Sequence, residues 1–303
     1  MKTPRILFFM GKGGTGKSTM SALAGVSLAR ENKKVLVVSL DAAHNLSDIF
    51  QAKLSNRAIK VHENLFAREV DQETIIRSYL NTTRDALKRS YAYLSAFNLD
   101  GYFDILKHSP GLEEYALVMA FQSIIEKNSD VDCLIFDMPP TALSLKFFNL
   151  PFLSRQWINH LKTLREKINE KKKIVSRIKL AGKDYTKDKI LGRIDRMNEQ
   201  YLSLEKSFQN SDTTDLFVVL NNNPLAVTET RRIIADLEAK KIFIKQILWN
   251  REMGKGKGKD LSGFPDYAAH LYFPEARFDL FGTGALGRYL DENGIGSEAF
   301  SFI

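Results

Sequence analysis

A nine-residue segment near the N-terminus has the residue types and spacing of a phosphate-binding loop. Residues 11–19 read GKGGTGKST, which fits the pattern G-x-x-x-x-G-K-[ST]. Glycines let successive backbone N–H groups turn inward toward phosphate oxygens, and a following helix adds the positive end of its dipole. The pattern predicts ATP binding, with Lys17 at the β- and γ-phosphates and the Ser18 hydroxyl on Mg²⁺. The candidate ATP-binding residues are Gly11, Lys12, Gly13, Gly14, Thr15, Gly16, Lys17, Ser18 and Thr19.

Two aspartates stand directly after apolar runs, where a parallel sheet would place them near the phosphates. Asp41 follows residues 35–40, and a carboxylate there could orient or deprotonate an attacking water. Asp also begins many helices as an N-cap, and position alone does not separate these two roles. Asp137 follows residues 133–136, the Walker B arrangement in which a carboxylate holds Mg²⁺ directly or through water. His44 and Asn45 could hold the loop after Asp41, or the water itself.

The elements that must position these residues are short apolar runs separated by helical patterns. Strands are predicted at 6–10, 35–40, 133–136 and 216–220, with later candidates at 247–249 and 271–273. Alternating strands and helices indicate an α/β fold with a doubly wound, mostly parallel sheet. Polar residues at the carboxyl ends of such strands meet at one edge of the sheet.

Two long stretches without predicted strands exceed what a minimal nucleotide-binding domain needs. Residues 72–128 and 146–210 are interpreted as one helical subdomain inserted in a single domain that spans 1–303. The first stretch contains an aromatic-rich segment at 91–103. These aromatic residues could form the subdomain's own core or an apolar groove for a client helix.

Composition limits the class of protein. The chain has 303 residues and 44% apolar content, without an apolar run near the ~20 residues that span a bilayer. The apolar run before residue 11 is too short for a signal peptide, and the single cysteine, Cys133, predicts a cytoplasmic protein without disulfides. The net charge of the chain is +8. Residues 155–210 account for all of it, because they contain fifteen Lys and Arg and seven Asp and Glu. The excess charge is therefore a local feature of one segment.

Lys12 makes the loop resemble the deviant P-loop G-K-G-G-x-G-K-[ST] of dimeric ATPases, which include nitrogenase reductase and the septum-site, partition, arsenite-pump and tail-anchored-protein targeting ATPases. Residues 41–48, DAAHNLSD, resemble the switch I signature D-P-A-H-N-L-S-D of the last two families. Residues 137–141, DMPPT, resemble their switch II, D-T-A-P-T. Further similarities lie at 65–71, 110–114, 227–231, Asn250-Arg251 and Pro274. The chain thus resembles an arsenite-pump-like ATPase from residue 5 to about 291.

The resemblance implies a site and an assembly. Asp41 would be the catalytic base, and Lys12 would reach the partner's nucleotide across a homodimer, as an arginine finger does elsewhere. Ser18 would bind Mg²⁺ directly and Asp137 through water, while Asn250 and Pro274 would frame the adenine. The helical subdomains would open and close with Mg²⁺-dependent ATP hydrolysis to bind and release a client.

Several positions depart from the pattern. The switch I proline is Ala42, the switch II Gly-His is Ala142-Leu143, and the late Pro-Glu pair is Asn222-Asn223. Residues 251–271 contain no cysteine, so the zinc site of the eukaryotic targeting ATPases cannot form there. An iron–sulfur cluster shared across a dimer needs two cysteines per chain, which excludes nitrogenase-reductase chemistry.

Three functions are weighed. The first is a membrane-protein targeting factor or chaperone that binds an apolar client helix or a membrane-associated partner. The second is the ATPase subunit of an anion or metalloid transport system, although one cysteine cannot supply a metalloid site. The third is a partition-type ATPase that uses the basic segment on DNA without sequence preference, so no specific nucleic acid is expected. The sequence does not identify the client or the roles of segments 155–210 and 254–259.

Overall fold

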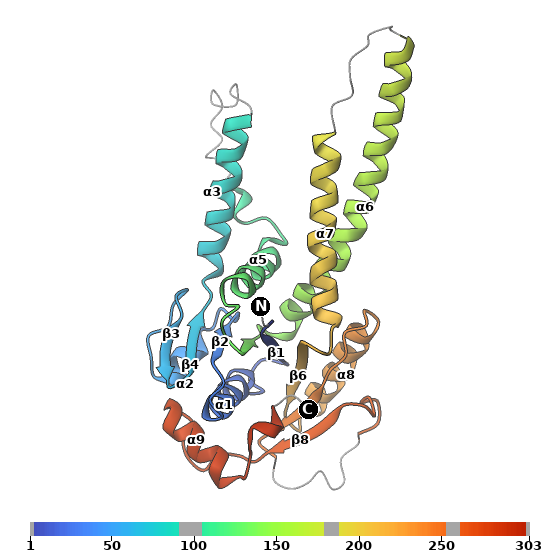
Figure 1. Ribbon diagram of the computed structural model, residues 1–303. Coiled ribbons are helices and arrows are strands. Elements are labelled where there is room, and N and C mark those ends of the chain that lie inside the picture. The colour runs from blue at the N-terminus through green and yellow to red at the C-terminus, as the bar shows by residue number, and fades with distance from the viewer. Residues whose placement is uncertain (1–2, 91–104, 179–187, 253–260, 301–303) are drawn as a thin grey trace. The chain divides into compact units, whose positions relative to one another are not determined.

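An eight-stranded sheet forms the centre of the structure, a computed structural model that describes residues 3–90, 105–178, 188–252 and 261–300 (Figure 1). The strand order is β3-β4-β2-β5-β1-β6-β7-β8, and every neighbouring pair is parallel except β3 with β4. The predicted α/β class is therefore confirmed. The strands are β1 (Arg5–Met10), β2 (Val35–Ser39), β3 (Ile59–His62), β4 (Leu65–Glu69), β5 (Cys133–Asp137), β6 (Thr214–Leu220), β7 (Gln246–Asn250) and β8 (Ala269–Phe273).

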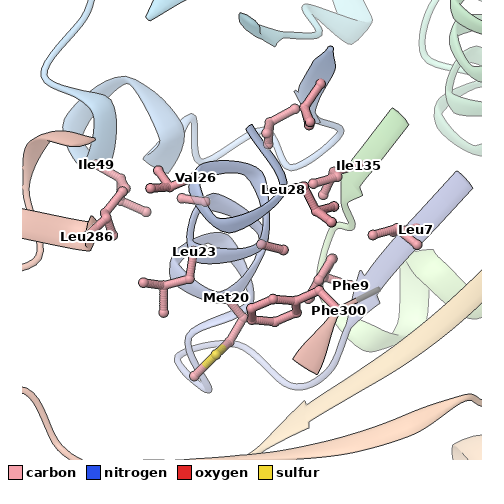
Figure 2. Close-up of a cluster of buried hydrophobic side chains, with 14 of the residues drawn as sticks. Leu7, Phe9, Met20, Leu23, Val26, Leu28, Ile49, Ile135, Leu286 and Phe300 are labelled. Carbon is pink, nitrogen blue, oxygen red and sulfur yellow. The ribbon is translucent and has the colours of Figure 1, made fainter. Parts of the chain in front are cut away.

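The strands β2, β5 and β6 are buried on both faces, so their sequences are mostly apolar. In β1, Leu7 and Phe9 lie in the cluster around α1 (Lys17–Arg30), whereas Phe8 points to the opposite face. Figure 2 shows Leu7 and Phe9 with Met20, Leu23 and other α1 side chains. The helices α2 (Asn45–Phe50) and α9 (Gly282–Glu292) and the 3₁₀ turn η2 (Ser297–Ala299) complete this face.

The opposite face of the sheet is covered by an aromatic cluster. Phe8 of β1 and Phe136 of β5 stack at 5.3 Å between ring centroids. Phe121 of α5 (Leu112–Lys127) lies 5.1 Å from Phe136 and 5.6 Å from Phe147 of α6 (Thr141–Ile178). Two further helices of the larger unit are α3 (Gln72–Ser90), which contacts α5, and α8 (Pro224–Glu238), which contacts β6. Helices on both faces leave the carboxyl edge of the sheet as the position for a site.

The chain divides into two compact units. The larger comprises residues 1–147 and 211–303, and the smaller comprises residues 148–210. In the smaller unit Phe148 of α6 lies 5.1 Å from Phe208 of α7 (Lys189–Gln209) between ring centroids, and Ile158 of α6 and Leu204 of α7 are buried. Ion pairs join the two helices at Lys162–Asp195 and Arg165–Asp188, both at 2.8 Å, and at Arg155–Glu205.

The described parts of 72–128 are helical and belong to the larger unit, with the sheet. The joining of 72–128 and 146–210 into one helical subdomain stays a prediction. The aromatic segment 91–103 lies outside the described residues. Within the described ranges, no helix combines the length and apolarity required to cross a bilayer.

Candidate nucleotide-binding site

The phosphate-binding loop connects the carboxyl end of β1 to the first residue of α1, as the sequence predicts. Gly16 precedes the helix with φ +95°, a left-handed conformation that favours glycine. A Cβ at Gly16 would overlap the side-chain amide of Asn250, and one at Gly11 would overlap the carbonyl oxygen of Val219. These two glycines therefore allow the loop to lie against β6 and β7.

The loop is closed by hydrogen bonds to one carbonyl. The Thr15 hydroxyl donates to the Lys12 carbonyl oxygen at 2.8 Å, and Lys17 Nζ donates to the same oxygen at 3.5 Å. Lys17 is buried, with 5% of its surface exposed. The buried ammonium at the N-terminus of α1 adds its positive charge to the positive end of the helix dipole, and both favour the binding of an anion at the loop.

Asp137 ends β5, in register with Ser39 of β2 and Phe9 of β1. Its side chain is completely buried, and neither carboxylate oxygen has a hydrogen-bond partner within ordinary distance. Burial raises the pKa of Asp137 to about 7, while the nearby Ser18 hydroxyl and Lys17 ammonium act in the opposite direction. A buried carboxylate whose oxygens lack donors, beside a serine hydroxyl, has the oxygen ligands that Mg²⁺ prefers.

Asp41 lies on the adjacent strand end, two residues beyond β2. The backbone N–H of Leu40 donates to the Asp137 carbonyl oxygen at 2.9 Å, which keeps the two strand ends together. Asp41 Oδ1 accepts a hydrogen bond from the Ala43 N–H at 3.1 Å. The helix α2 begins at Asn45, with His44 in the N-cap position and no side-chain cap. Asp41 therefore does not cap this helix, and that alternative is wrong.

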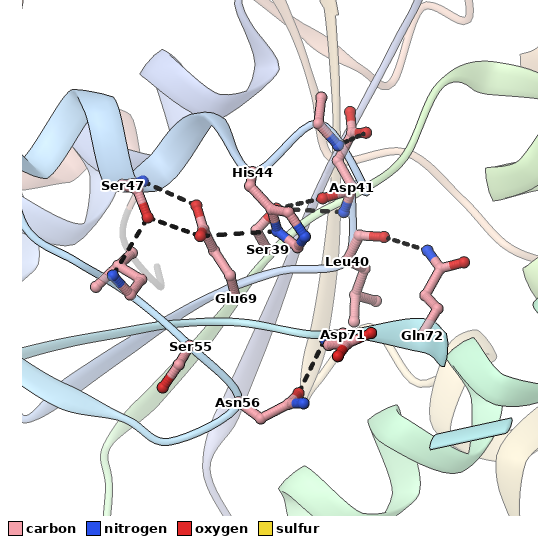
Figure 3. Close-up of polar contacts among 12 residues, drawn as sticks. Ser39, Leu40, Asp41, His44, Ser47, Ser55, Asn56, Glu69, Asp71 and Gln72 are labelled. Atoms are coloured by element: carbon pink, nitrogen blue, oxygen red, sulfur yellow. Dashed lines mark hydrogen bonds and ion pairs between the residues drawn. The ribbon is translucent and has the colours of Figure 1, made fainter. Parts of the chain in front are cut away.

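The loop that carries Asp41 is held by Glu69, a residue that sequence reasoning missed (Figure 3). Glu69 ends β4, is only 4% exposed, and accepts hydrogen bonds from the Ser47 N–H at 2.8 Å and the Ser47 hydroxyl at 2.7 Å. His44 Nδ1 lies 3.7 Å from Glu69 Oε2. From the start of α3, Gln72 Nε2 donates to the Leu40 carbonyl oxygen at 3.1 Å. The sequence signal that could have identified Glu69 is its position as a glutamate at the end of a short strand.

A second part of the site is a cavity of about 290 Å³ beside the loop. The structure brings Asn250, Pro274, Gly16 and Thr19 together in its wall, with apolar side chains that include Phe278. Asn250 Nδ2 donates to the Thr15 carbonyl oxygen at 2.8 Å, which joins the end of β7 to the loop. The wall combines apolar side chains with polar ones, among them Arg251, Glu275 and Asp279, and a concave site of this kind can take a nucleotide base.

Lys12 and Asn45 are among the predicted residues that do not line this cavity. Lys12 is exposed, and its Nζ lies 3.5 Å from Glu229 Oε2 of α8, a partner that the sequence analysis did not name. Asn45 is exposed at the first position of α2 and is not among the described residues that line the cavity.

Comparison with known proteins identifies relatives over most of the chain. The family model described as anion-transporting ATPase matches residues 4–261. The protein is similar to the ATPase get3 of Schizosaccharomyces pombe, at 30% identity over 253 residues, 81% of this chain and 72% of that protein. It is similar to an ATPase ASNA1 homolog of Plasmodium vivax, at 32% identity over 260 residues, and to the ATPase GET3A of Arabidopsis thaliana, at 27% over 256 residues. The match covers 82% of this chain and 64% of the Plasmodium protein, and 81% of this chain and 68% of the Arabidopsis protein.

Proposed function

We propose a reaction cycle from the premise that this chain belongs to the anion-transporting ATPase family and is an ATPase of that family. The chain hydrolyses ATP with Mg²⁺ as a homodimer in the cytoplasm, and the cycle drives binding and release of a client. One observation carries the proposal: β2, β5 and β1 are neighbours, so Asp41, Asp137 and the phosphate-binding loop share one edge of the sheet.

Asp41 is the proposed base. It follows β2 by two residues, is 8% exposed, and has its loop fixed by the Ala43 N–H and by Ser39. A carboxylate held this way can accept a proton from a water that attacks the γ-phosphate. Lys17 and the loop N–H groups stabilise the charge that develops on the phosphate oxygens.

Ser18 and Asp137 are the residues that would hold Mg²⁺, the first directly and the second through water. When bound, the ion neutralises charge on the β- and γ-phosphate oxygens. The Asp137 carboxylate is buried near the Ser18 hydroxyl and makes no hydrogen bond within ordinary distance, which supports a water-mediated contact. Asn250 holds the loop through Thr15 and, with Pro274, bounds the cavity proposed for adenine.

Lys12 is the proposed contact to the nucleotide of a second subunit. Its side chain is 45% exposed and projects from the loop to a surface shared with Glu229. The ion pair between Lys12 and Glu229 is exposed and contributes little stability. Lys12 can therefore leave Glu229 and contact a phosphate oxygen of the nucleotide bound to the second subunit.

The family description names anion transport, which supports the second candidate function, an ATPase subunit of a transport system. Cys133 is the chain's single cysteine and is fully buried, and burial raises the pKa of its thiol. Because thiolates are the soft ligands that a metalloid would need, this chain alone is a poor metalloid binder.

The test uses Asp41→Asn and Lys12→Ala, with Asp266→Asn and Lys53→Ala as exposed controls on the same unit. Asp41→Asn should lower ATP turnover by roughly 10²-fold or more and leave ATP affinity intact. Mixing the two inactive variants should restore turnover, because one site in each mixed dimer then has its own Asp41 and its partner's Lys12. Full turnover by Asp41→Asn would refute the base, and no restoration on mixing would refute the action of Lys12 across a dimer.

The client is sought with the Asp41→Asn variant, which should retain ATP and its partner. Proteins that co-purify with this variant in ATP, and not in ADP, would define the client class. Turnover stimulated by an oxyanion, without any protein partner, would favour the transport function instead. Binding to DNA at low salt would favour the partition-type function.

A further inference from the structure

We propose that the smaller unit docks on the surface of anionic lipid bilayers through one face of α6. Five large apolar side chains on this helix are between 37% and 71% exposed: Leu153, Trp157, Leu161, Leu164 and Ile168. We call these five residues the α6 stripe. Their spacing of four, four, three and four residues keeps them within about 80° of the helix circumference, along about 22 Å of its length.

The α6 stripe is separate from the face that packs against α7. That packing face carries Arg155, Ile158, Lys162 and Arg165, of which Ile158 is 5% exposed and the other three are in ion pairs with α7. At 100° per residue, the centres of the two faces lie about 120° apart on the helix. The pairing of α6 with α7 therefore leaves the stripe uncovered, and contiguous exposed apolar surface of this kind marks an interaction site.

The charges beside the α6 stripe indicate an anionic partner. Lys167 and Lys171 are exposed on its border, whereas Glu166 and Glu170 fall on the other side of the helix. The surrounding segment 155–210 carries the chain's whole positive surplus. An apolar client helix would need no such charge, but anionic headgroups attract Lys and Arg while apolar side chains enter the boundary below them.

Trp157 fits the same partner. It is 71% exposed at the second position of the stripe, and tryptophan is favoured at the interface between headgroups and acyl chains. Long lysine side chains beside it can lie along the bilayer and keep their ammonium groups among the headgroups. The inference does not depend on the roles proposed for Asp41 or Lys12, because all of its residues lie in the smaller unit.

The chain contains its own reporter for the test. It has two tryptophans, and Trp249 is 1% exposed, so a change of environment on binding comes from Trp157. We expect the emission of the full-length wild-type protein to shift to the blue with phosphatidylglycerol-containing vesicles and to be quenched when their lipids carry bromine. Phosphatidylcholine vesicles should give neither effect, and added salt should weaken the binding.

Two double variants separate the apolar and the charged contribution. Leu161→Ser/Leu164→Ser should abolish co-sedimentation with vesicles, whereas Leu225→Ser, at a more exposed apolar position on α8, should not. Lys167→Gln/Lys171→Gln should weaken binding roughly tenfold or more, and Lys53→Gln/Lys60→Gln should leave it unchanged despite the same loss of net charge.

Three results would overturn the proposal. The first is the absence of any shift with anionic vesicles. The second is equal binding to neutral vesicles, or equal loss in the stripe variants and their controls. The third is a Trp157 shift that appears without lipid, either with rising protein concentration or with a transmembrane-helix peptide, since the stripe would then serve self-association or client binding. Circular dichroism of each variant establishes that its helices are retained.

Discussion

Glu69→Gln is the substitution that tests whether the loop after β2 must be held in place for turnover. Glu69 is nearly fully buried and accepts two short hydrogen bonds from Ser47, and His44 approaches the same carboxylate (Figure 3). These contacts fix the first turn of α2, a few residues after Asp41. Glutamine has the same shape, so the substitution changes the acceptor and adds no cavity.

The magnitude follows from the contacts. Glutamine retains one acceptor oxygen and turns an NH₂ group toward the other donor, so one hydrogen bond to a charged acceptor is lost and a buried donor is left unpaired. Such a loss costs about 2 kcal/mol. If the ordered loop is required for turnover, kcat falls by up to roughly 30-fold. ATP affinity should change little, because Glu69 lies outside the described walls of the nucleotide cavity.

The assay compares kcat, KM and thermal unfolding for the wild type, Glu69→Gln and Glu63→Gln, the last an exposed glutamate beside the same strand. Adding Ser47→Ala to Glu69→Gln should cost less than the sum of the two single effects, since both remove one contact. Unchanged kcat with a lowered melting temperature would show that Glu69 only stabilises the fold. An equal fall in ATP affinity and kcat would also refute the reasoning.

Three further predictions follow from the site. Gly16→Ala should weaken nucleotide binding tenfold or more, because φ is +95° and a Cβ would overlap a neighbouring amide; Gly192→Ala, outside the site, where a Cβ meets nothing within 4 Å, is the control in the same titration. Glu229→Gln should raise turnover by no more than roughly fivefold at low protein concentration, since an exposed ion pair with Lys12 is weak; a fall would contradict its role as a competing partner. Burial raises the folded-state pKa of Asp137 to about 7, so stability without nucleotide and in EDTA should decrease as pH rises from about 4 to about 7. Asp137→Asn should remove that slope and raise the melting temperature above pH 7, and an unchanged slope would refute the assignment.

The sequence predicts the parts of the site that stand at strand ends. The phosphate-binding loop, Asp41 and Asp137 each follow an apolar run, and the parallel order of β2, β5 and β1 brings them to one edge. Asn250 and Pro274 were identified only through the family resemblance. The structure adds the reason for their proximity: Asn250 of β7 is in register with Phe273 of β8, the residue before Pro274, and Asn250 contacts the Thr15 carbonyl oxygen.

Other features depend on contacts that no local pattern contains. β3 is a short, half-exposed edge strand, antiparallel to β4, and its four residues give too little periodicity to predict it. Glu69 contacts a residue 22 positions away, and Glu229 contacts a residue in the first loop of the chain. From the sequence alone, carboxylates such as Glu69 and Glu229 are expected on the solvent-exposed surface. Only the fold shows that a donor lies beside them.

The six residues of α2 are bracketed by His44 at φ +52° and Gln51 at φ +51°, both left-handed and neither a glycine. A helix of this length has no stability of its own in water, and each left-handed side chain adds a cost of roughly 1–2 kcal/mol. What holds α2 is the burial of Leu46, Ile49 and Phe50 together with Glu69. We therefore predict that the stability of this segment, measured by the exchange of its amide hydrogens, depends on these buried contacts and on Glu69 and not on the helix itself.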